Sequence, residues 1–368
     1  MKGWLGLGPV FAAALILVGC GGGQSAPATA TGAGQPKTLA DLNAALKGKT
    51  AEDRKQALLQ GAQQEGAFLL YSTMNAADAQ ALIDGFNKAY PAVHAEVFRT
   101  TNNDLANKAL TEVRAKKTSF DLIDISPESI LTYQDAGAVV PYDSPSFDGL
   151  QKDMRDSQGY WAYMYLNGVV AAWNTTKVKP DEAPKSYDDY LQPRWKDKLS
   201  IDTQDAAWAE FIKATMGEAK GTDFLKKLAG QNPHMLDGRT NQLNLLTAGE
   251  FDLSVALFDY SLIAAKKKGA PVDYAYLRPT MIAGEALLAD KTAPHPNAAL
   301  LFADWLFSRD GMQVLADQTG RMVPRTDVKL KNPEIADQTK GPIWVQGPDS
   351  GKNLSQKEKE FSSLFKGK

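Results

Sequence analysis

Short apolar runs recur along the chain and alternate with stretches in which apolar residues are three or four positions apart. The runs predict β-strands at 68–71, 93–98, 122–125, 169–173, 199–201, 253–257 and 285–288. The helical spacing is seen in Leu82, Phe86 and Ala89, and again in Phe302, Trp305 and Leu306. Strands that alternate with helices predict an α/β fold built on mostly parallel sheets.

The amino terminus has the pattern of a secretory signal. Lys2 precedes an apolar run over 10–18, which is too short for a stable membrane span. The run ends in Leu17, Val18, Gly19 and Cys20, which resembles a bacterial lipobox, so we expect cleavage before Cys20 and lipidation of its thiol. Residues 21–36 carry no charge and no large apolar side chain, and they predict a flexible tether. The alternative for Cys20 is an ordinary buried cysteine.

Polar residues gather where the predicted strands end. In open α/β sheets, ligands bind at the carboxyl ends of strands, opposite helix amino termini whose free N–H groups suit an anion. Such strand ends occur in both halves of the chain, so we expect a cleft with two walls. The candidate ligand-binding residues at these ends are Ser72, Thr73, Asn75, Arg99, Thr101, Ser126, Glu128, Asp202, Thr203, Arg239 and Thr240.

Composition limits the classes of function. The 368 residues suffice for two or three domains, and the hydrophobic fraction of 43% is ordinary for a globular protein. Lys and Arg total 41 against 43 Asp and Glu, so the balance lacks the basic excess that nucleic-acid binding requires. Cys20 is the single cysteine, which excludes an intramolecular disulfide and a CxxC site.

The order of several short motifs resembles the extracellular solute-binding proteins of ABC importers, in the cluster that includes ferric-iron-binding periplasmic proteins. The resemblance covers about residues 54 to 368. The motifs are GAQQEG at 61–66, FNKAYP at 86–91, FDLID at 120–124, WN at 173–174, PRWKDKL at 193–199, LLTAGEFD at 245–252 and the stretch 320–328.

The resemblance implies a type II periplasmic-binding-protein fold, in which two α/β lobes joined by a hinge close on a ligand in the interlobe cleft. The expected parts are a signal peptide at 1–20, the tether at 21–36, lobe 1 at 37–165 and 275–318, lobe 2 at 166–274, and a carboxyl-terminal segment at 319–368 that packs on lobe 2. The implied partners are an ABC permease and its ATPase. We expect a monomer in the periplasm or at the cell surface, held to the membrane only through the lipid on Cys20.

Ferric iron is one class of cargo that the resemblance implies. Ferric members hold the metal with tyrosines, usually adjacent, and many add a His or Glu. In this sequence the matching loop carries Asp259 and the single Tyr260, and Thr73 stands near the position where a histidine is expected. Asn167 lies where some ferric members carry arginines. These positions add Asn167, Asp259 and Tyr260 to the candidate ligand-binding residues, with Tyr260 a metal ligand if the cargo is ferric.

A small organic or phosphorylated anion is the other class of cargo. Arg99 follows a predicted strand in the first half of the chain, and Arg239 opens a predicted helix in the second half. Both would hold such an anion together with helix amino termini. Sugars and polyols are further possibilities. No resident cofactor is expected in any of these cases.

Enzyme signatures are missing from the sequence. The three histidines, His94, His234 and His295, form no HxxxH or HExxH pattern, and there is no GxSxG motif. The stretch 347–352 has only three residues between its glycines and fails the phosphate-loop pattern. We therefore expect a binding protein, with a periplasmic enzyme or a structural envelope lipoprotein as remote alternatives.

Overall fold

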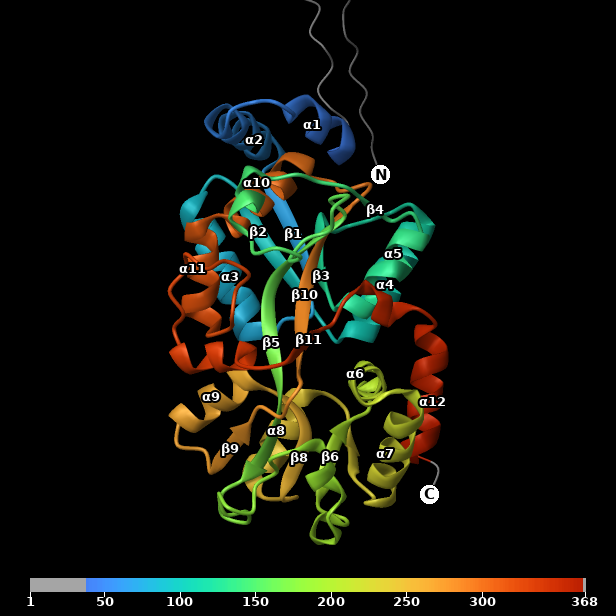
Figure 1. Cartoon of the computed structure of the whole chain (residues 1–368). Helices are drawn as coiled ribbons and strands as arrows, with labels where there is room; N and C mark the ends of the chain where they lie inside the picture. The colour runs from blue at the N-terminus through green and yellow to red at the C-terminus, as the bar shows by residue number, and fades with distance from the viewer. Residues whose placement is uncertain (1–37, 367–368) are drawn as a thin grey trace, which may run out of the picture. The chain divides into compact units, whose positions relative to one another are not determined.

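A computed structural model describes residues 38–366 (Figure 1). The expected signal peptide, most of the tether and Cys20 lie outside the described residues. Within the described part, no helix has both the length and the apolar character needed to cross a bilayer.

Lobe 1 is the set of elements around the amino-terminal sheet. Its strands are β1 (Ala67–Ser72), β2 (His94–Arg99), β3 (Leu122–Ile125), β4 (Val139–Val140) and β10 (Thr280–Asp290). Its helices are α1 (Leu39–Leu46), α2 (Ala51–Glu65), α3 (Ala76–Ala89), α4 (Asn102–Ala115), α5 (Pro127–Asp135), α10 (Pro296–Phe307) and α11 (Arg309–Thr319), with the 3-10 turn η1 (Pro145–Gly149). β1 pairs in parallel with β2 and β3, whereas β10 runs antiparallel to β3.

Lobe 2 is the set of elements around the second half of the sheet. Its strands are β6 (Leu199–Asp202), β7 (His234–Leu236), β8 (Leu253–Phe258) and β9 (Val272–Ala275). Its helices are α6 (Ala206–Met216), α7 (Glu218–Gly230), α8 (Arg239–Ala248) and α9 (Asp259–Lys267), with the 3-10 turns η2 (Tyr187–Leu191) and η3 (Pro193–Trp195). β6 pairs in parallel with β7 and β8.

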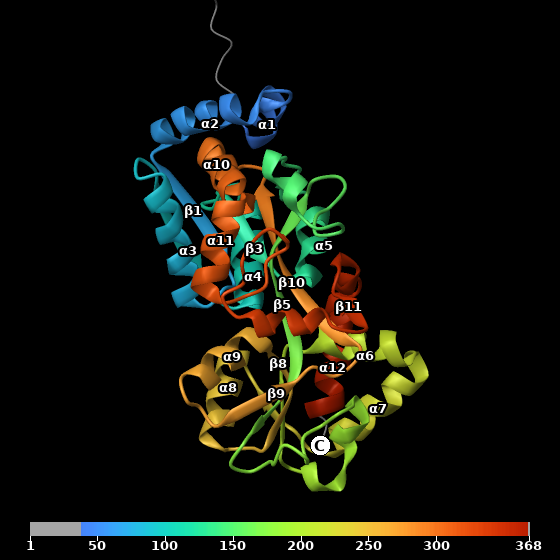
Figure 2. The ribbon, with the colours of Figure 1, turned by 60° about the vertical axis from the view of Figure 1, so that its left-hand side comes forward.

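Two long strands run between the lobes, β5 (Trp161–Asn174) and β10 (Figures 1 and 2). β5 pairs antiparallel with β10 from Trp161 to Gly168 and then with β8 and β9 from Val169 to Asn174. β5 therefore belongs to the sheets of both lobes and changes its pairing partners between Gly168 and Val169. Both strands are almost wholly buried, so their long apolar runs give no alternation that marks the crossing.

The predicted α/β alternation is confirmed, and all seven predicted strands exist. The expectation of mostly parallel sheets holds at the outer strands of each lobe and is wrong at β5 and β10, which pair antiparallel. The short strands β4, β7, β9 and β11 (Ile343–Val345) were missed. β7 contains His234 and has only three residues, so its pattern could not be told from a turn.

The chain after α11 contacts both lobes, not lobe 2 alone. It contains η4 (Pro333–Thr339), β11, η5 (Pro348–Gly351) and α12 (Leu354–Lys366). Val323 and Val328 belong to the core of lobe 1, η5 packs on α5, and α12 packs on α6 and α7. Phe361 of α12 reaches the lobe 2 core, so the segment links the two lobes.

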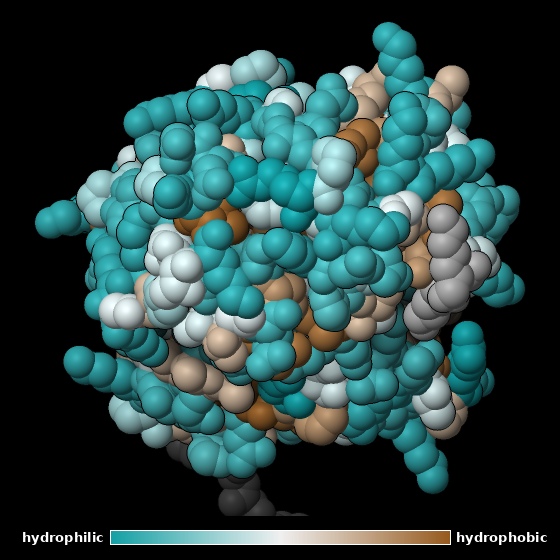
Figure 3. All heavy atoms as spheres, turned by 90° about the horizontal axis from the view of Figure 1, so that it is seen from below, coloured by the Kyte–Doolittle hydropathy of each residue, from teal (hydrophilic) through white to brown (hydrophobic). Residues whose placement is uncertain are grey.

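Separate hydrophobic cores support the two lobes. Phe68, Phe86 and Phe302 lie within one lobe 1 core, whereas Trp195 and Trp208 lie in a lobe 2 core. The face of lobe 2 seen from below is mainly hydrophilic, and its apolar areas are small (Figure 3). The strand ends that face each other between the two cores are where a polar site is expected.

Candidate functional site

A cavity of about 530 Å³ is lined by residues of both lobes and of the strands that join them. Predicted residues in this lining are Thr73, Asn75, Arg99, Thr101, Ser126, Glu128, Asp202, Arg239, Thr240 and Tyr260. They come from loops and helix starts that follow strands, because the carboxyl ends of β1, β2, β3, β6 and β8 face this space. We call this cavity the cleft.

Four predicted residues, Ser72, Asn167, Thr203 and Asp259, do not line the cleft. Ser72 is buried and its hydroxyl donates to Asp124 Oδ2 at 2.5 Å, and Asn167 is buried within β5. Asp259 is buried at the start of α9 and accepts the Tyr276 hydroxyl at 2.9 Å. Burial raises the pKa of Asp259 to about 7. Ser72 and Asp259 thus have structural partners directly behind the cleft.

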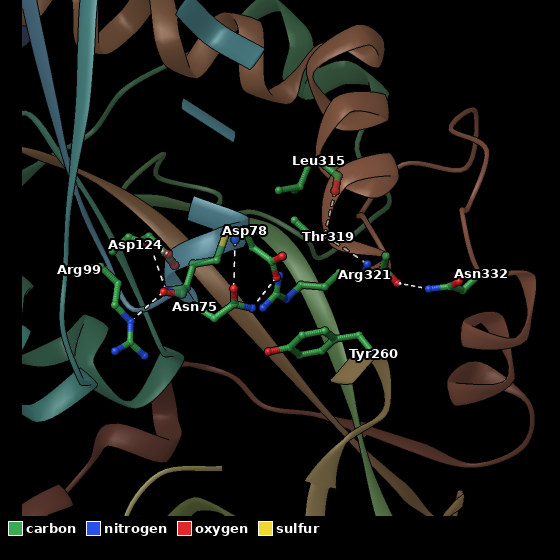
Figure 4. Close-up of polar contacts among 12 residues, drawn as sticks. Asn75, Asp78, Arg99, Asp124, Tyr260, Leu315, Thr319, Arg321 and Asn332 are labelled. Atoms are coloured by element: carbon green, nitrogen blue, oxygen red, sulfur yellow. Dashed lines mark hydrogen bonds and ion pairs between the residues drawn. The ribbon is translucent and has the colours of Figure 1, made fainter. Parts of the chain in front are cut away.

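The lobe 1 wall presents an arginine with free terminal nitrogens. Arg99 ends β2 and is exposed, and its Nε donates to the Met74 carbonyl at 3.0 Å. Its two terminal nitrogens have no hydrogen-bond partner among the described residues (Figure 4). The bond to Met74 holds the guanidinium across the end of β1. The neighbouring Asn75 is the N-cap of α3, and its side-chain oxygen accepts the Asp78 N–H.

The lobe 2 wall presents an arginine that the protein itself neutralises. Arg239 begins α8, its guanidinium pairs with Asp205, and it stacks 4.4 Å above the Phe258 ring. Asp205 is 1% exposed, and burial raises its pKa to about 7 although Arg239 opposes the rise. Burial disfavours the charged form of Arg239, but Asp205, Asp202 and Glu128 outweigh it and raise its pKa. Arg239 therefore already has its counter-ion.

Several carboxylates also line the cleft. Glu128 lies in the first turn of α5 and accepts the Ser126 hydroxyl at 2.7 Å and the Gln346 side chain. Asp202 is 3% exposed, and its Oδ1 accepts the Gln204 N–H at 2.9 Å. Glu285 extends from β10, and burial together with Asp124 and Glu128 raises its pKa well above the ordinary value.

Sequence reasoning missed two of these acids. Glu285 was predicted only as the first residue of a strand. A lone glutamate among apolar strand residues is a signal that could have indicated a site. Asp205 was missed because the polar residues directly after the strand, Asp202 and Thr203, are the nearer candidates for a helix start. In the structure α6 begins at Ala206, and Asp205 is its N-cap.

Tyr260 lies at the cleft beneath a buried arginine (Figure 4). Arg321 is 2% exposed, its guanidinium lies 3.8 Å above the Tyr260 ring and 4.7 Å from the Tyr165 ring, and it pairs with Asp78 of α3. Asp78 belongs to lobe 1 and Tyr260 to lobe 2, so Arg321 joins the lobes by an ion pair and a cation–π contact. Nothing in the sequence alone pointed to Arg321, because its partners are remote along the chain.

The described residues, 38–366, include no cluster of three or more His, Cys, Asp and Glu side chains that could hold a metal ion. Tyr260 is the one tyrosine in the cleft lining, and its ring face is already covered by a cation. The lining instead combines hydrogen-bonding side chains, one free guanidinium and several carboxylates.

Comparisons with known proteins agree with this architecture. Residues 117–342 match the family described as "Bacterial extracellular solute-binding protein". The "Fe(3+)-binding periplasmic protein" of Serratia marcescens is 22% identical over 268 residues, which cover 70% of this chain and 78% of that protein.

Solved structures with the same fold hold different ligands. Iron-bound HitA from Pseudomonas aeruginosa has a TM-score of 0.69 and 16% identity, and covers 80% of this chain and 99% of its own. AfuA from Actinobacillus pleuropneumoniae, with exogenous fructose-6-phosphate bound, has a TM-score of 0.72 and 18% identity, and covers 82% and 99%. These periplasmic binding proteins confirm the predicted two-lobe fold.

Proposed function

The chain belongs to the bacterial extracellular solute-binding proteins, and from this premise we propose that it binds a small organic anion in the cleft and delivers it to an ABC permease. Members of this family are binding proteins rather than enzymes. In this proposal the protein acts outside the inner membrane, with the lipid on Cys20 as its anchor.

The unpaired guanidinium of Arg99 is the observation that carries the proposal. An arginine with two free terminal nitrogens offers bidentate hydrogen bonds to a phosphate or carboxylate. Asn75 lines the cleft with it, and its side-chain amide has a second N–H to donate besides the one bonded to Asp78. The Thr101 hydroxyl also lines the cleft, but it donates to Asp104. A cavity of about 530 Å³ lies in the size range of sites for small organic molecules.

The surroundings of Tyr260 argue against ferric iron as the cargo. Arg321 places a permanent positive charge 3.8 Å from the ring centre. Asp78 balances this charge, but the guanidinium, held by Asp78 and the Tyr165 ring, covers one face of the Tyr260 ring and restricts the approach of a ferric ion. The sugar-phosphate complex of a protein with this fold supports the anion class.

The test compares anions with ferric citrate on the purified full-length chain, after removal of bound metal with a chelator. Titration calorimetry with glucose 6-phosphate, glycerol 3-phosphate, inorganic phosphate and citrate measures anion binding. Visible absorbance after addition of ferric citrate reports a tyrosinate-to-iron charge-transfer band, with citrate alone as the control. We expect heat from at least one phosphate compound and no visible band.

The opposite result would establish the ferric alternative. A visible band in the wild type that disappears in Tyr260→Phe would make Tyr260 an iron ligand and overturn the proposal. If neither a band nor any anion binding is observed, the anion class is rejected as well, and uncharged sugars and polyols are the next compounds to titrate.

A further inference from the structure

We propose that the anionic ligand also carries a positively charged amine, which binds between Glu128 of lobe 1 and Asp202 of lobe 2. This inference rests on the proposed function, and it narrows the substrate class to zwitterionic molecules such as amino sugar phosphates or aminoalkyl phosphates. Arg99 holds the anionic end, and the carboxylates hold the amine.

The charge balance of the cleft is the first argument. Five carboxylates line it, against the two guanidinium groups of Arg99 and Arg239. Arg239 is paired with Asp205, so Arg99 is the one cation in the lining without an acidic partner. A dianion alone would enter a cleft with excess negative charge, and a compensating ammonium group on the ligand removes that repulsion.

An open acceptor atom is the second argument. Asp202 is 3% exposed and lines the cleft, and its Oδ2 accepts no hydrogen bond from any described residue. This oxygen is open to the cleft, and because an ionised carboxylate only accepts hydrogen bonds, it is available to an N–H group of a ligand.

The position of Glu128 and Asp202 on opposite walls is the third argument. Glu128 and Asp202 come from opposite lobes, and both line the cleft. An ammonium group bound between them makes contacts to both lobes at once, and such contacts favour the closed state over the open one.

Arg99 lies apart from this acidic pair. It ends β2, which is separated by β1 from β3, the strand that precedes Glu128. Neighbouring strands lie about 4.8 Å apart, so these two strand ends are about 10 Å apart. A ligand with its two charges separated by a short carbon skeleton fits this arrangement.

The test uses two pairs of compounds that differ only in the amine. Glucosamine 6-phosphate is compared with glucose 6-phosphate, and O-phosphoethanolamine with 2-hydroxyethyl phosphate, by calorimetry on the full-length chain at pH 7. Because charge-assisted hydrogen bonds are about twice as strong as neutral ones, we expect the amine to raise affinity at least tenfold in one pair.

Asp202→Asn and Glu128→Gln test the location of the amine. Each change keeps the shape of the side chain and removes one charge, so each should reduce several-fold the ratio of the affinities for the amine and amine-free members of a pair. Asp223→Asn on the outer helix α7, where Asp223 pairs with Lys227, is the matched control and should leave the ratio unchanged.

The outcomes separate the two proposals. Equal affinity within both pairs, or tighter binding of the amine-free member, overturns the amine inference and leaves the anion proposal standing. Binding of no member of either pair rejects both. A preference for the amine that survives Asp202→Asn and Glu128→Gln unchanged overturns the site assigned here.

Discussion

The two walls of the cleft each carry an arginine after a strand, and the two arginines differ in their partners. Arg99 of lobe 1 is exposed with its terminal nitrogens free, whereas Arg239 of lobe 2 is held by Asp205 and Phe258. The comparison shows that a cation at a strand end is available to a ligand only where the fold supplies no counter-ion. Arg99 therefore belongs to recognition, and Arg239 to the stability of the wall.

Replacing Arg239 should have the largest effect. Arg239→Gln leaves Asp205, which is 1% exposed, without its cation, and removal of one partner of a buried pair costs roughly 3 kcal/mol. Urea unfolding at pH 7.5 measures the loss. Arg194→Gln, at an exposed pair with Glu182, is the control and should change the free energy of unfolding far less. Similar losses in both variants would remove the distinction drawn between a structural and a surface arginine.

Replacing Arg99 should show the reverse pattern. Arg99→Gln removes a charged donor that has only one protein partner, so we expect anion affinity to fall about 30-fold, or about 2 kcal/mol. The free energy of unfolding should stay within about 0.5 kcal/mol. Calorimetry with the tightest phosphate compound measures the first quantity, and Arg114→Gln on the exposed face of α4 is the matched control. Unchanged affinity would show that the free guanidinium has no part in binding.

The same contrast explains what the sequence could predict. Strand ends such as Arg99, Asn75 and Ser126 were found because a polar cap directly after an apolar run is a local signal. The helix starts at Asn75 and Arg239 follow from the same kind of local pattern. These features depend on neighbours a few residues away, so a single sequence is enough to predict them.

Features that depend on partners far away in the sequence could not be predicted from the sequence alone. Arg239 and Arg99 look alike in sequence, and only the fold brings Asp205 to one of them. Arg321 meets Asp78 across 243 positions. β5 and β10 pair antiparallel through buried apolar runs that carry no information on direction.

Acid pH should stabilise the lobe 2 wall. The pKa of Asp205 is raised to about 7 by burial, from the model-peptide value of 3.8, so the native state binds more protons than the unfolded state between these values. Stability therefore falls as pH rises through this window. One such group contributes about 2 kcal/mol between pH 5.5 and 7.5.

Urea unfolding at both pH values checks this contribution, with Asp205→Asn as the comparison. The variant lacks the titrating carboxylate, so its free energy of unfolding should change less with pH than that of the wild type, whatever its absolute stability. Equal slopes for the two proteins would mean that Asp205 does not titrate in this range. Arg99→Gln retains Asp205, so its free energy of unfolding should keep the pH dependence of the wild type.

Changes at Tyr260 should have the smallest effect, and they address the contact that joins the two walls. Tyr260→Phe keeps the aromatic face under Arg321, so the free energy of unfolding should change by less than about 0.5 kcal/mol. Tyr260→Leu removes that face and should cost about 1 kcal/mol through the lost cation–π contact. Thermal and urea unfolding of the two variants measure the difference. If phenylalanine proves as costly as leucine, the hydroxyl rather than the ring stabilises the link. In that case Arg321 would no longer be the residue that couples the lobes through Tyr260.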